Sequence, residues 1–146
     1  MTSTRDPKAP TYSDIISAKP YLISPGDTVK LAVIHYPESR YDVSVIFEVW
    51  DVGGSQPPNM HEKSVETFFF LSGEGIAYCD DYTTRINAGG FLMLPAQTTH
   101  RIQNTGASRL YAITTMSPDA GFADLIISGT PSNFDPEDLI VISGYH

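Results

Sequence analysis

The side chains best suited to chemistry in this sequence are two of its four histidines and one glutamate. His61 is followed five positions later by Glu66, and His100 comes in a later segment of the chain. Two imidazoles and one carboxylate leave coordination positions open on a metal, and this ligand set suits Fe(II) and also Mn, Ni or Zn. If the fold brings the three side chains together, the residue types predict a site for one divalent transition metal, with iron as the first candidate.

Burying the Glu66 carboxylate in the core would cost free energy unless the carboxylate has a partner. It lies in Val65–Ser72, a segment with the composition of a β-strand. Alternation along a strand puts Glu66 on the same face as Phe68 and Phe70. If that face points into the protein, a carboxylate there must be paired or must bind a metal.

Asn59 precedes His61 by two positions, so the two side chains face the same way in a strand. Its amide oxygen would be a weaker ligand for a transition metal than an imidazole. Asn is equally at home as a turn residue, here directly after Pro57-Pro58. Taken singly, His61 and His100 would each be read as a partly buried histidine satisfied by hydrogen bonds.

Short β-rich segments alternate with turn signals along most of the chain. At 146 residues the chain is sized for one domain. Frequent turns between short strands predict a β-sandwich or barrel. The expected strands are Val29–Tyr36, Val43–Val52, Val65–Ser72, Gly75–Asp80, Thr83–Asn87, Phe91–Pro95, Thr99–Gln103 and Arg109–Met116.

The expected organisation is a barrel with a polar arm before it and a helical tail after it. Residues 1–28 form the arm and lead-in, with a short helical turn at Ser13–Ala18. The barrel spans 29–117. The tail spans 118–146 and packs on the barrel or on a partner. Its capping residues and prolines predict helical segments over Gly121–Ser128 and from Asp135 to Gly144.

One acidic residue interrupts an otherwise apolar strand. Glu48 could be an acid of the pocket, but alternation within Val43–Val52 favours Val45, Phe47 and Val49 toward the core, which leaves Glu48 facing outward. On this interpretation no general acid or base stands out beyond the two histidines and the glutamate.

The charge balance excludes two classes of partner. The net charge is -8, from 17 acidic and 9 basic residues, and the basic residues are scattered. Binding to nucleic acid or to an anionic membrane needs clustered basic surface. Cys79 is the only cysteine, which fits a reducing compartment. With no apolar run long enough for a signal or a membrane span, we expect a cytoplasmic protein.

Two stretches of the sequence resemble the two signature motifs of the cupin superfamily. Matches to the first motif are His61, Glu66 and Gly73. Matches to the second motif are Gly89, Pro95, His100 and Asn104. The sequence departs from the pattern at Asn59, where the first motif has a histidine, and at Gln97, where the second has a glycine. If position 97 requires positive φ, a glutamine there is strained.

The resemblance implies an all-β fold: a double-stranded antiparallel β-barrel of the jelly-roll, cupin/RmlC-like type, with short helical segments at the C-terminus. It implies a metal held by His61, Glu66 and His100, with Asn59 as a weak additional ligand. The barrel interior would hold the substrate. Its apolar wall is then expected to be formed by Phe68, Phe70 and Ile102.

The resemblance also implies a function, without selecting one reaction. Cupin enzymes of this kind include oxygenases, isomerases and lyases that act on small organic molecules. The alternative is a non-catalytic cupin that binds a small ligand and has a weakened or absent metal site, which the Asn59 substitution favours. Edge-strand pairing in the family predicts a homodimer. Phe69 and Leu71 are then expected to face a second apolar layer or the partner subunit.

Overall fold

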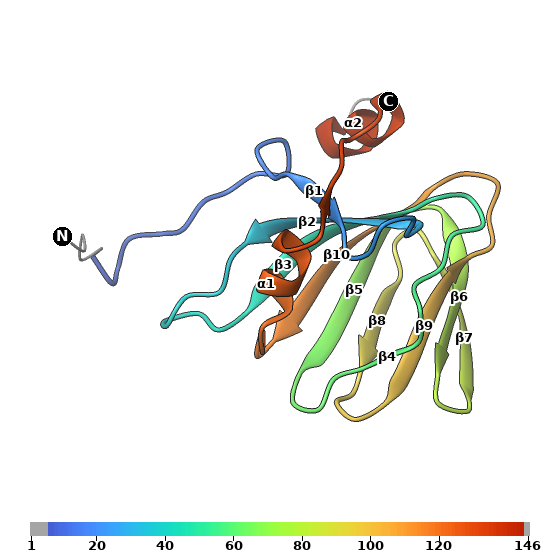
Figure 1. Ribbon diagram of the computed structural model, residues 1–146, viewed down its shortest axis with the longest axis horizontal. Helices are drawn as coiled ribbons and strands as arrows, with labels where there is room; N and C mark the ends of the chain where they lie inside the picture. The colour runs from blue at the N-terminus through green and yellow to red at the C-terminus, as the bar shows by residue number, and fades with distance from the viewer. Residues whose placement is uncertain (1–5, 145–146) are drawn as a thin grey trace.

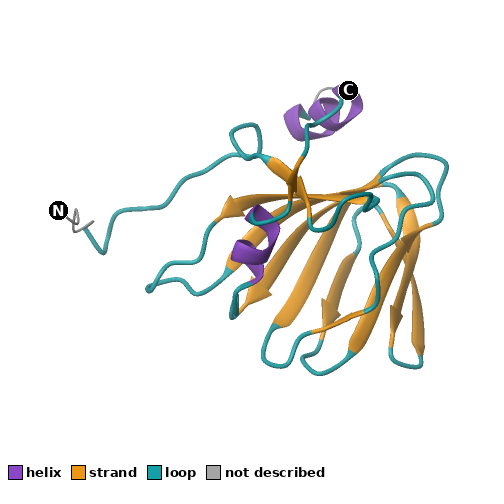
Figure 2. Ribbon diagram, in the orientation of Figure 1, coloured by secondary structure: helices purple, strands orange, loops and turns teal. Residues whose placement is uncertain are grey.

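The computed structural model describes residues 6–144, which form two antiparallel β-sheets that face each other (Figures 1 and 2). The ends of the expected arm and tail, residues 1–5 and 145–146, lie outside the described residues. The strands are β1 (Pro20–Leu22), β2 (Val29–His35), β3 (Ser44–Trp50), β4 (Asn59–Met60), β5 (Val65–Ser72), β6 (Glu74–Cys79), β7 (Tyr82–Asn87), β8 (Phe91–Leu94), β9 (Thr99–Asn104), β10 (Leu110–Ser117) and β11 (Thr130–Pro131).

The two sheets differ in size. The larger has the strand order β11-β1-β2-β3-β10-β5-β8, and the smaller has the order β4-β9-β6-β7. The larger sheet therefore includes β1 and β11, which lie outside the predicted barrel range 29–117. Every pairing is antiparallel, and sheets of this kind close around a core as a jelly roll.

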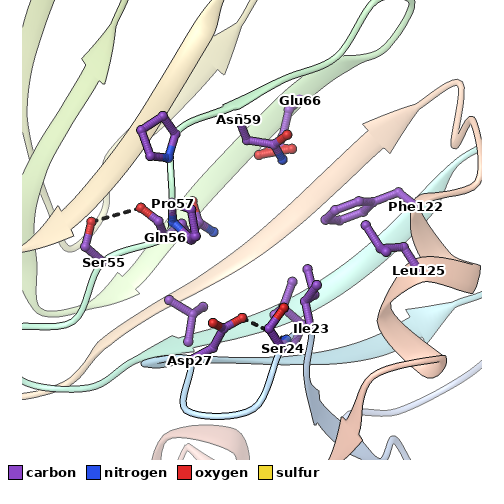
Figure 3. A pocket seen from close by; sticks show the side chains of 13 residues that line it. Ile23, Ser24, Asp27, Ser55, Gln56, Pro57, Asn59, Glu66, Phe122 and Leu125 are labelled. Carbon is purple, nitrogen blue, oxygen red and sulfur yellow. Dashed lines mark hydrogen bonds between the residues drawn. The ribbon is translucent and has the colours of Figure 1, made fainter.

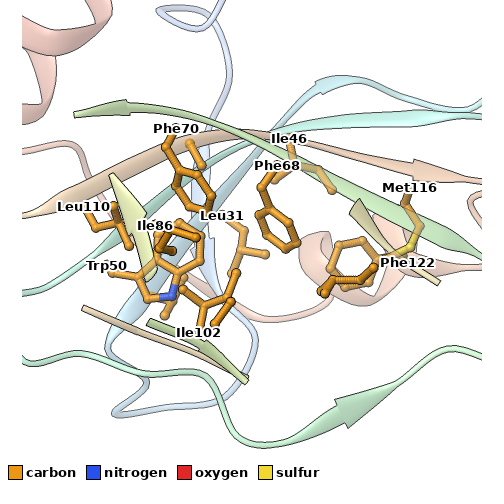
Figure 4. Packing of buried hydrophobic residues seen from close by; sticks show 14 of the residues in the cluster. Leu31, Ile46, Trp50, Phe68, Phe70, Ile86, Ile102, Leu110, Met116 and Phe122 are labelled. Atoms are coloured by element: carbon orange, nitrogen blue, oxygen red, sulfur yellow. The ribbon is translucent and has the colours of Figure 1, made fainter. Parts of the chain in front are cut away.

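The core lies between the sheets and follows from strand alternation. On β5, Glu66, Phe68 and Phe70 are buried, while Phe69 and Leu71 are exposed. The rings of Phe68 and Phe70 stack with centroids 6.0 Å apart. Figure 4 shows these rings packed with side chains from the other strands and from α1. The apolar residues that this cluster buries include Leu31, Ile46, Trp50, Ile102, Leu110 and Met116.

The prediction for Glu48 is wrong, because both faces of β3 are covered. Glu48 is 1% exposed and lies between Ile46 and Trp50, which face the interior of the barrel. Phe47 and Val49 point to the other side, where they join a second buried cluster. Segments from both ends of the chain cover that outer face, and their residues include Ile15, Ala18, Phe134, Val141 and Ile142.

Two short helices follow the barrel within the two predicted segments. The second begins at the expected Asp135 cap, whereas the first begins after Gly121 and not at the expected Ser117 cap. Helix α1 (Phe122–Ile127) packs against the inner cluster, and α2 (Pro136–Ser143) packs against the outer one. The expected helical turn at Ser13–Ala18 is instead a non-helical turn, in which the Asp14 carboxylate accepts the Ser17 backbone N–H. No helix within residues 6–144 is long and apolar enough to cross a membrane.

Candidate metal centre

The fold brings His61, Glu66 and His100 together from three separate segments. Glu66 is the second residue of β5, His100 is the second residue of β9, and His61 follows β4 directly. Their potential ligand atoms all lie within 4.8 Å of one another. The large sheet thus supplies the carboxylate, and the small sheet and the chain leaving it supply the two imidazoles.

The two imidazoles point at the same carboxylate through their Nε2 atoms. His61 Nε2 lies 3.2 Å from Glu66 Oε2, and His100 Nε2 lies 3.6 Å from Glu66 Oε1. The ring centroids of the two histidines are 5.3 Å apart. A convergent set of two imidazole nitrogens and one carboxylate fits a divalent transition metal such as iron.

Backbone contacts explain why His61 lies at this place without belonging to a strand. Asn59 pairs with His100 in the β4–β9 register. One residue past the end of β4, the His61 carbonyl accepts the backbone N–H of Gln97 at 2.7 Å. Gln97 has φ of 65°, so the position does require the left-handed conformation that a glycine adopts without strain. The chain retains this turn despite the glutamine.

Electrostatics keep the carboxylate of Glu66 ionised. Burial alone would raise its pKa, but hydrogen bonds from His100 and His61 outweigh burial and hold the pKa below its ordinary value. An ionised carboxylate is the form that binds a metal. At 4% exposure, Glu66 is a buried negative charge whose close polar contacts are these two histidines.

Two features set this centre apart from a complete three-histidine set. The Asn59 amide nitrogen lies 3.3 Å from His61 Nε2, so the side chain reaches the histidine and stands in the polar cluster. The Nδ1 atom of His100 is buried and has no hydrogen-bond partner within residues 6–144. Metal-bound histidines usually donate this second ring N–H to an acceptor, which orients the ring.

A cavity of about 230 Å³ opens beside the cluster, and Glu66 and Asn59 form part of its wall. Helix α1 and the segment before β2 close the opposite sides (Figure 3). The Phe122 ring also packs edge-on against the His61 ring, with centroids 5.7 Å apart. The apolar part of the wall includes Ile23, Val29, Leu31, Pro57, Phe122 and Leu125.

The residues expected to line the pocket lie elsewhere. Phe68, Phe70 and Ile102 are fully buried in the core between the sheets and do not line this cavity. Sequence reasoning named the correct face of β5 but missed the wall contributed by α1 and β2. The buried alternation of β2 was a usable signal for Val29 and Leu31, because both face inward on that strand.

Glu48 is a second carboxyl group inside the barrel, on the face opposite to the one that alternation favoured for it. Thr114 donates a hydrogen bond from its hydroxyl to Glu48 Oε2 at 2.9 Å. Burial raises the pKa of Glu48 well above its ordinary value, and the negative charge of Glu66 raises it further. In the β2–β3 register Glu48 stands opposite Leu31, a residue of the cavity wall. The cavity therefore has a buried carboxyl group behind its wall, in addition to Glu66, which lines it.

Solved structures of other proteins share this architecture. A predicted oxalate decarboxylase from Thermotoga maritima matches with a TM-score of 0.62 and 20% identity, over 73% of this chain and 97% of that one. The Cnp3 cupin domain of Schizosaccharomyces pombe matches with a TM-score of 0.58 and 18% identity, over 62% of this chain and 64% of that domain. An oxalate oxidase matches with a TM-score of 0.58 and 18% identity, over 73% of this chain and 58% of that one.

The family model of the cupin domain matches residues 46–116, which run from β3 to β10 and include the whole His–Glu–His cluster. The protein belongs to the cupin superfamily. The matched part of this chain spans less than two thirds of the Cnp3 domain and of the oxalate oxidase. At 18% sequence identity, the similarity to these two structures shows a shared fold and nothing further. No curated protein matches this cupin in sequence.

Proposed function

We propose that this cupin is an enzyme that holds one divalent transition metal, iron in the first instance, at His61, Glu66 and His100. The observation that carries the proposal is the convergence of three ligand atoms within 4.8 Å beside a cavity. A metal bound there would supply Lewis-acid or oxygen chemistry, which covers oxygenase, isomerase and lyase reactions. A small organic molecule in the cavity would be the substrate, and Asn59 is a weaker additional contact to the metal.

The residues of the chain have defined tasks in this proposal. Glu66 supplies the negative charge, and its low pKa keeps that charge at neutral pH. Phe122 packs on the His61 ring and limits the approach of water from the side of α1. The apolar wall formed by β2 and α1 holds the body of the substrate against the cluster.

A non-catalytic, ligand-binding cupin is the second candidate, and two observations favour it. Asn59 replaces a stronger imidazole ligand, and His100 Nδ1 lacks an outer acceptor within the described chain. Both features weaken metal binding relative to a complete site. In this case the cavity binds a small molecule without a reaction at a metal.

Metal uptake by the parent protein and by Asn59→His separates the two candidates. We expect the chelator-treated parent to take up one equivalent of Fe(II), Mn, Ni or Zn. An added imidazole should raise the affinity of Asn59→His by at least about tenfold, or roughly 1.4 kcal/mol. Elemental analysis after dialysis and calorimetric titration measure both. If the parent takes up no metal while Asn59→His does, the ligand-binding function replaces the enzymatic one.

We further propose that the protein is a cytoplasmic homodimer that pairs through β8. This strand ends the large sheet, so one of its backbone edges is unpaired within residues 6–144. Next to that edge lie four exposed apolar side chains, and Phe69 stands opposite Phe91 in the β5–β8 register. An apolar face beside a free edge is suited to a second copy of the same surface. The four side chains are Phe69, Leu71, Phe91 and Met93.

Light scattering tests the dimer. We expect the parent to have the mass of two chains at micromolar concentration, and Phe91→Glu to have the mass of one. Phe91 is 63% exposed in the single chain, so the charge is tolerated there and acts on association alone. Tyr82→Glu, on the edge strand of the other sheet, is the matched control at 77% exposure. A parent with the mass of one chain contradicts the dimer.

A further inference from the structure

We propose that the cavity beside the His–Glu–His cluster selects an uncharged, partly apolar small molecule and rejects organic anions. The cavity is a property of the folded chain, whereas its role as a substrate site rests on the proposed function. The inference rests on the charge, the apolar wall and the size of the cavity.

The charged groups on the cavity wall are both acidic. Asp27 and Glu66 line it, and none of the described lining residues is a lysine, arginine or histidine. The Asp27 carboxylate accepts the Ser24 backbone N–H at 2.9 Å, which holds it at the rim (Figure 3). Lys63 does not line this cavity but lines an adjoining hollow, which shares Asn59, Phe122 and Leu125 with it.

The nearby guanidinium group of Arg101 is engaged elsewhere. Its Nη1 atom lies 3.2 Å from Ser55 Oγ, at the edge of the cavity wall. However, Arg101 lies over the Tyr78 ring, 4.4 Å from the centroid, and donates a hydrogen bond to Gln103 at 2.9 Å. An anion entering the cavity would therefore lose its hydration and meet two carboxylates, with no cationic side chain on the cavity wall to offset them.

In the metal-free cavity a dianion meets the strongest repulsion, because the two acidic side chains on the wall, Glu66 and Asp27, share its sign of charge. The oxalate named for two structural relatives is such a dianion. A neutral molecule with a polar end toward Asn59 and an apolar body between Leu31 and Leu125 fits both the charge and the wall.

The volume of the cavity narrows the class of ligand further. The cavity holds about 230 Å³, below the roughly 300–1,000 Å³ typical of sites for drug-sized ligands. A short aliphatic chain with one polar end matches this volume better than a sugar or a nucleotide. The ligand class is therefore an uncharged molecule with a few carbon atoms and one hydrogen-bonding head.

Hexanamide and hexanoate test the inference, because they share a chain and differ in charge. We expect hexanamide to shift the amide signals of Leu31 and Leu125 in ¹⁵N NMR spectra of the chelator-treated protein at pH 7. Its affinity should exceed that of hexanoate by at least about tenfold. Equal or tighter binding of hexanoate at these residues overturns the proposal, as does the absence of shifts with both compounds.

Two matched substitutions test whether the preference for an uncharged ligand arises at the cavity. Leu125 and Leu139 are exposed leucines on the two helices, at 50% and 45%, and only Leu125 lines the cavity. Leu125→Arg should raise the affinity for hexanoate about tenfold, whereas Leu139→Arg should leave it unchanged. Equal effects of the two variants contradict a role for the cavity. No metal is required in these titrations, so their failure is distinguishable from a failure of the proposed metal-dependent function.

Discussion

His100→Ala should abolish stoichiometric metal binding and leave a folded barrel, and His61→Ala should do the same. Each variant removes one of three ligands that converge within 4.8 Å. Changes to residues that merely orient metal ligands cost roughly 10–100-fold in affinity, so the loss of a ligand should exceed about 100-fold. Elemental analysis after dialysis, with Zn and Fe(II) added separately, measures the occupancy.

The fold of these variants is checked independently of the metal. Circular dichroism of the chelator-treated proteins should show the parent's strand content, because the apolar cluster between the sheets includes neither histidine. His35→Ala is the matched control, since His35 ends β2 and does not belong to the cluster. Full metal occupancy in His61→Ala or His100→Ala would contradict the assignment of these ligands.

The grouping of His61, Glu66 and His100 was accessible to sequence reasoning because local rules decide most of it. Alternation on β5 puts Glu66 on the face of Phe68 and Phe70, and that face is buried in the structure. The motif spacing then selects His61 and His100 among the four histidines. The turn at Gln97 was also foreseeable. The second motif has a glycine at this position, and glycine adopts the positive φ observed there without strain.

The environment of β3 could not be predicted from the sequence, because alternation separates the two faces of a strand without indicating which segments cover each face. The face of Phe47 and Val49 looks like the natural core side, since Glu48 is the one charged residue of the strand. Distant segments cover that face, and Phe134 packs edge-on against Phe47 with centroids 5.8 Å apart. Glu48 then has to face the barrel interior, where the Thr114 hydroxyl serves as its partner.

The wall of the cavity was missed for the same physical reason. Phe122 and Leu125 line the cavity, and Asp119 fixes the start of the helix that carries them. The Asp119 carboxylate accepts the backbone N–H groups of Gly121 and Ala123, at 3.1 and 3.0 Å. The sequence placed a helix near this position but carried no signal for the side of the barrel on which it lies.

Asp138→Ala should lower the free energy of unfolding at pH 7 by about 3 kcal/mol, because it removes a buried charge with several partners. The Asp138 side chain is 0% exposed and lies in the first turn of α2. It accepts hydrogen bonds from the Tyr111 hydroxyl at 2.8 Å and from Arg109 Nη1 at 2.9 Å, and Lys30 Nζ lies 3.1 Å away. It also accepts the backbone N–H of Asp135 at 2.8 Å.

Removing this carboxylate leaves two mostly buried cations short of a partner. The side chains of Lys30 and Arg109 are 11% and 16% exposed, and the remaining partner that they share is Asp135, which is itself 48% exposed. The contact between α2 and the outer face of the large sheet then weakens. Urea denaturation of parent and variant measures the change. Asp124→Asn, on α1, is the control and should change stability by no more than about 0.5 kcal/mol.

The cost of Asp138→Asn should depend on pH, with a sign fixed by the pKa of Asp138. Burial raises this pKa, but hydrogen bonds from the Asp135 backbone, Tyr111 and Arg109 outweigh burial and hold it below its ordinary 3.8. The stabilising contribution is therefore fully present above pH 3.8 and is lost as the pH falls through the lower folded-state value. Parent and variant should differ most at neutral pH and converge in strong acid. A difference that grew on acidification would mean that the carboxylate is not stabilised in its ionised form, and the anchoring of α2 would then rest on its apolar contacts alone.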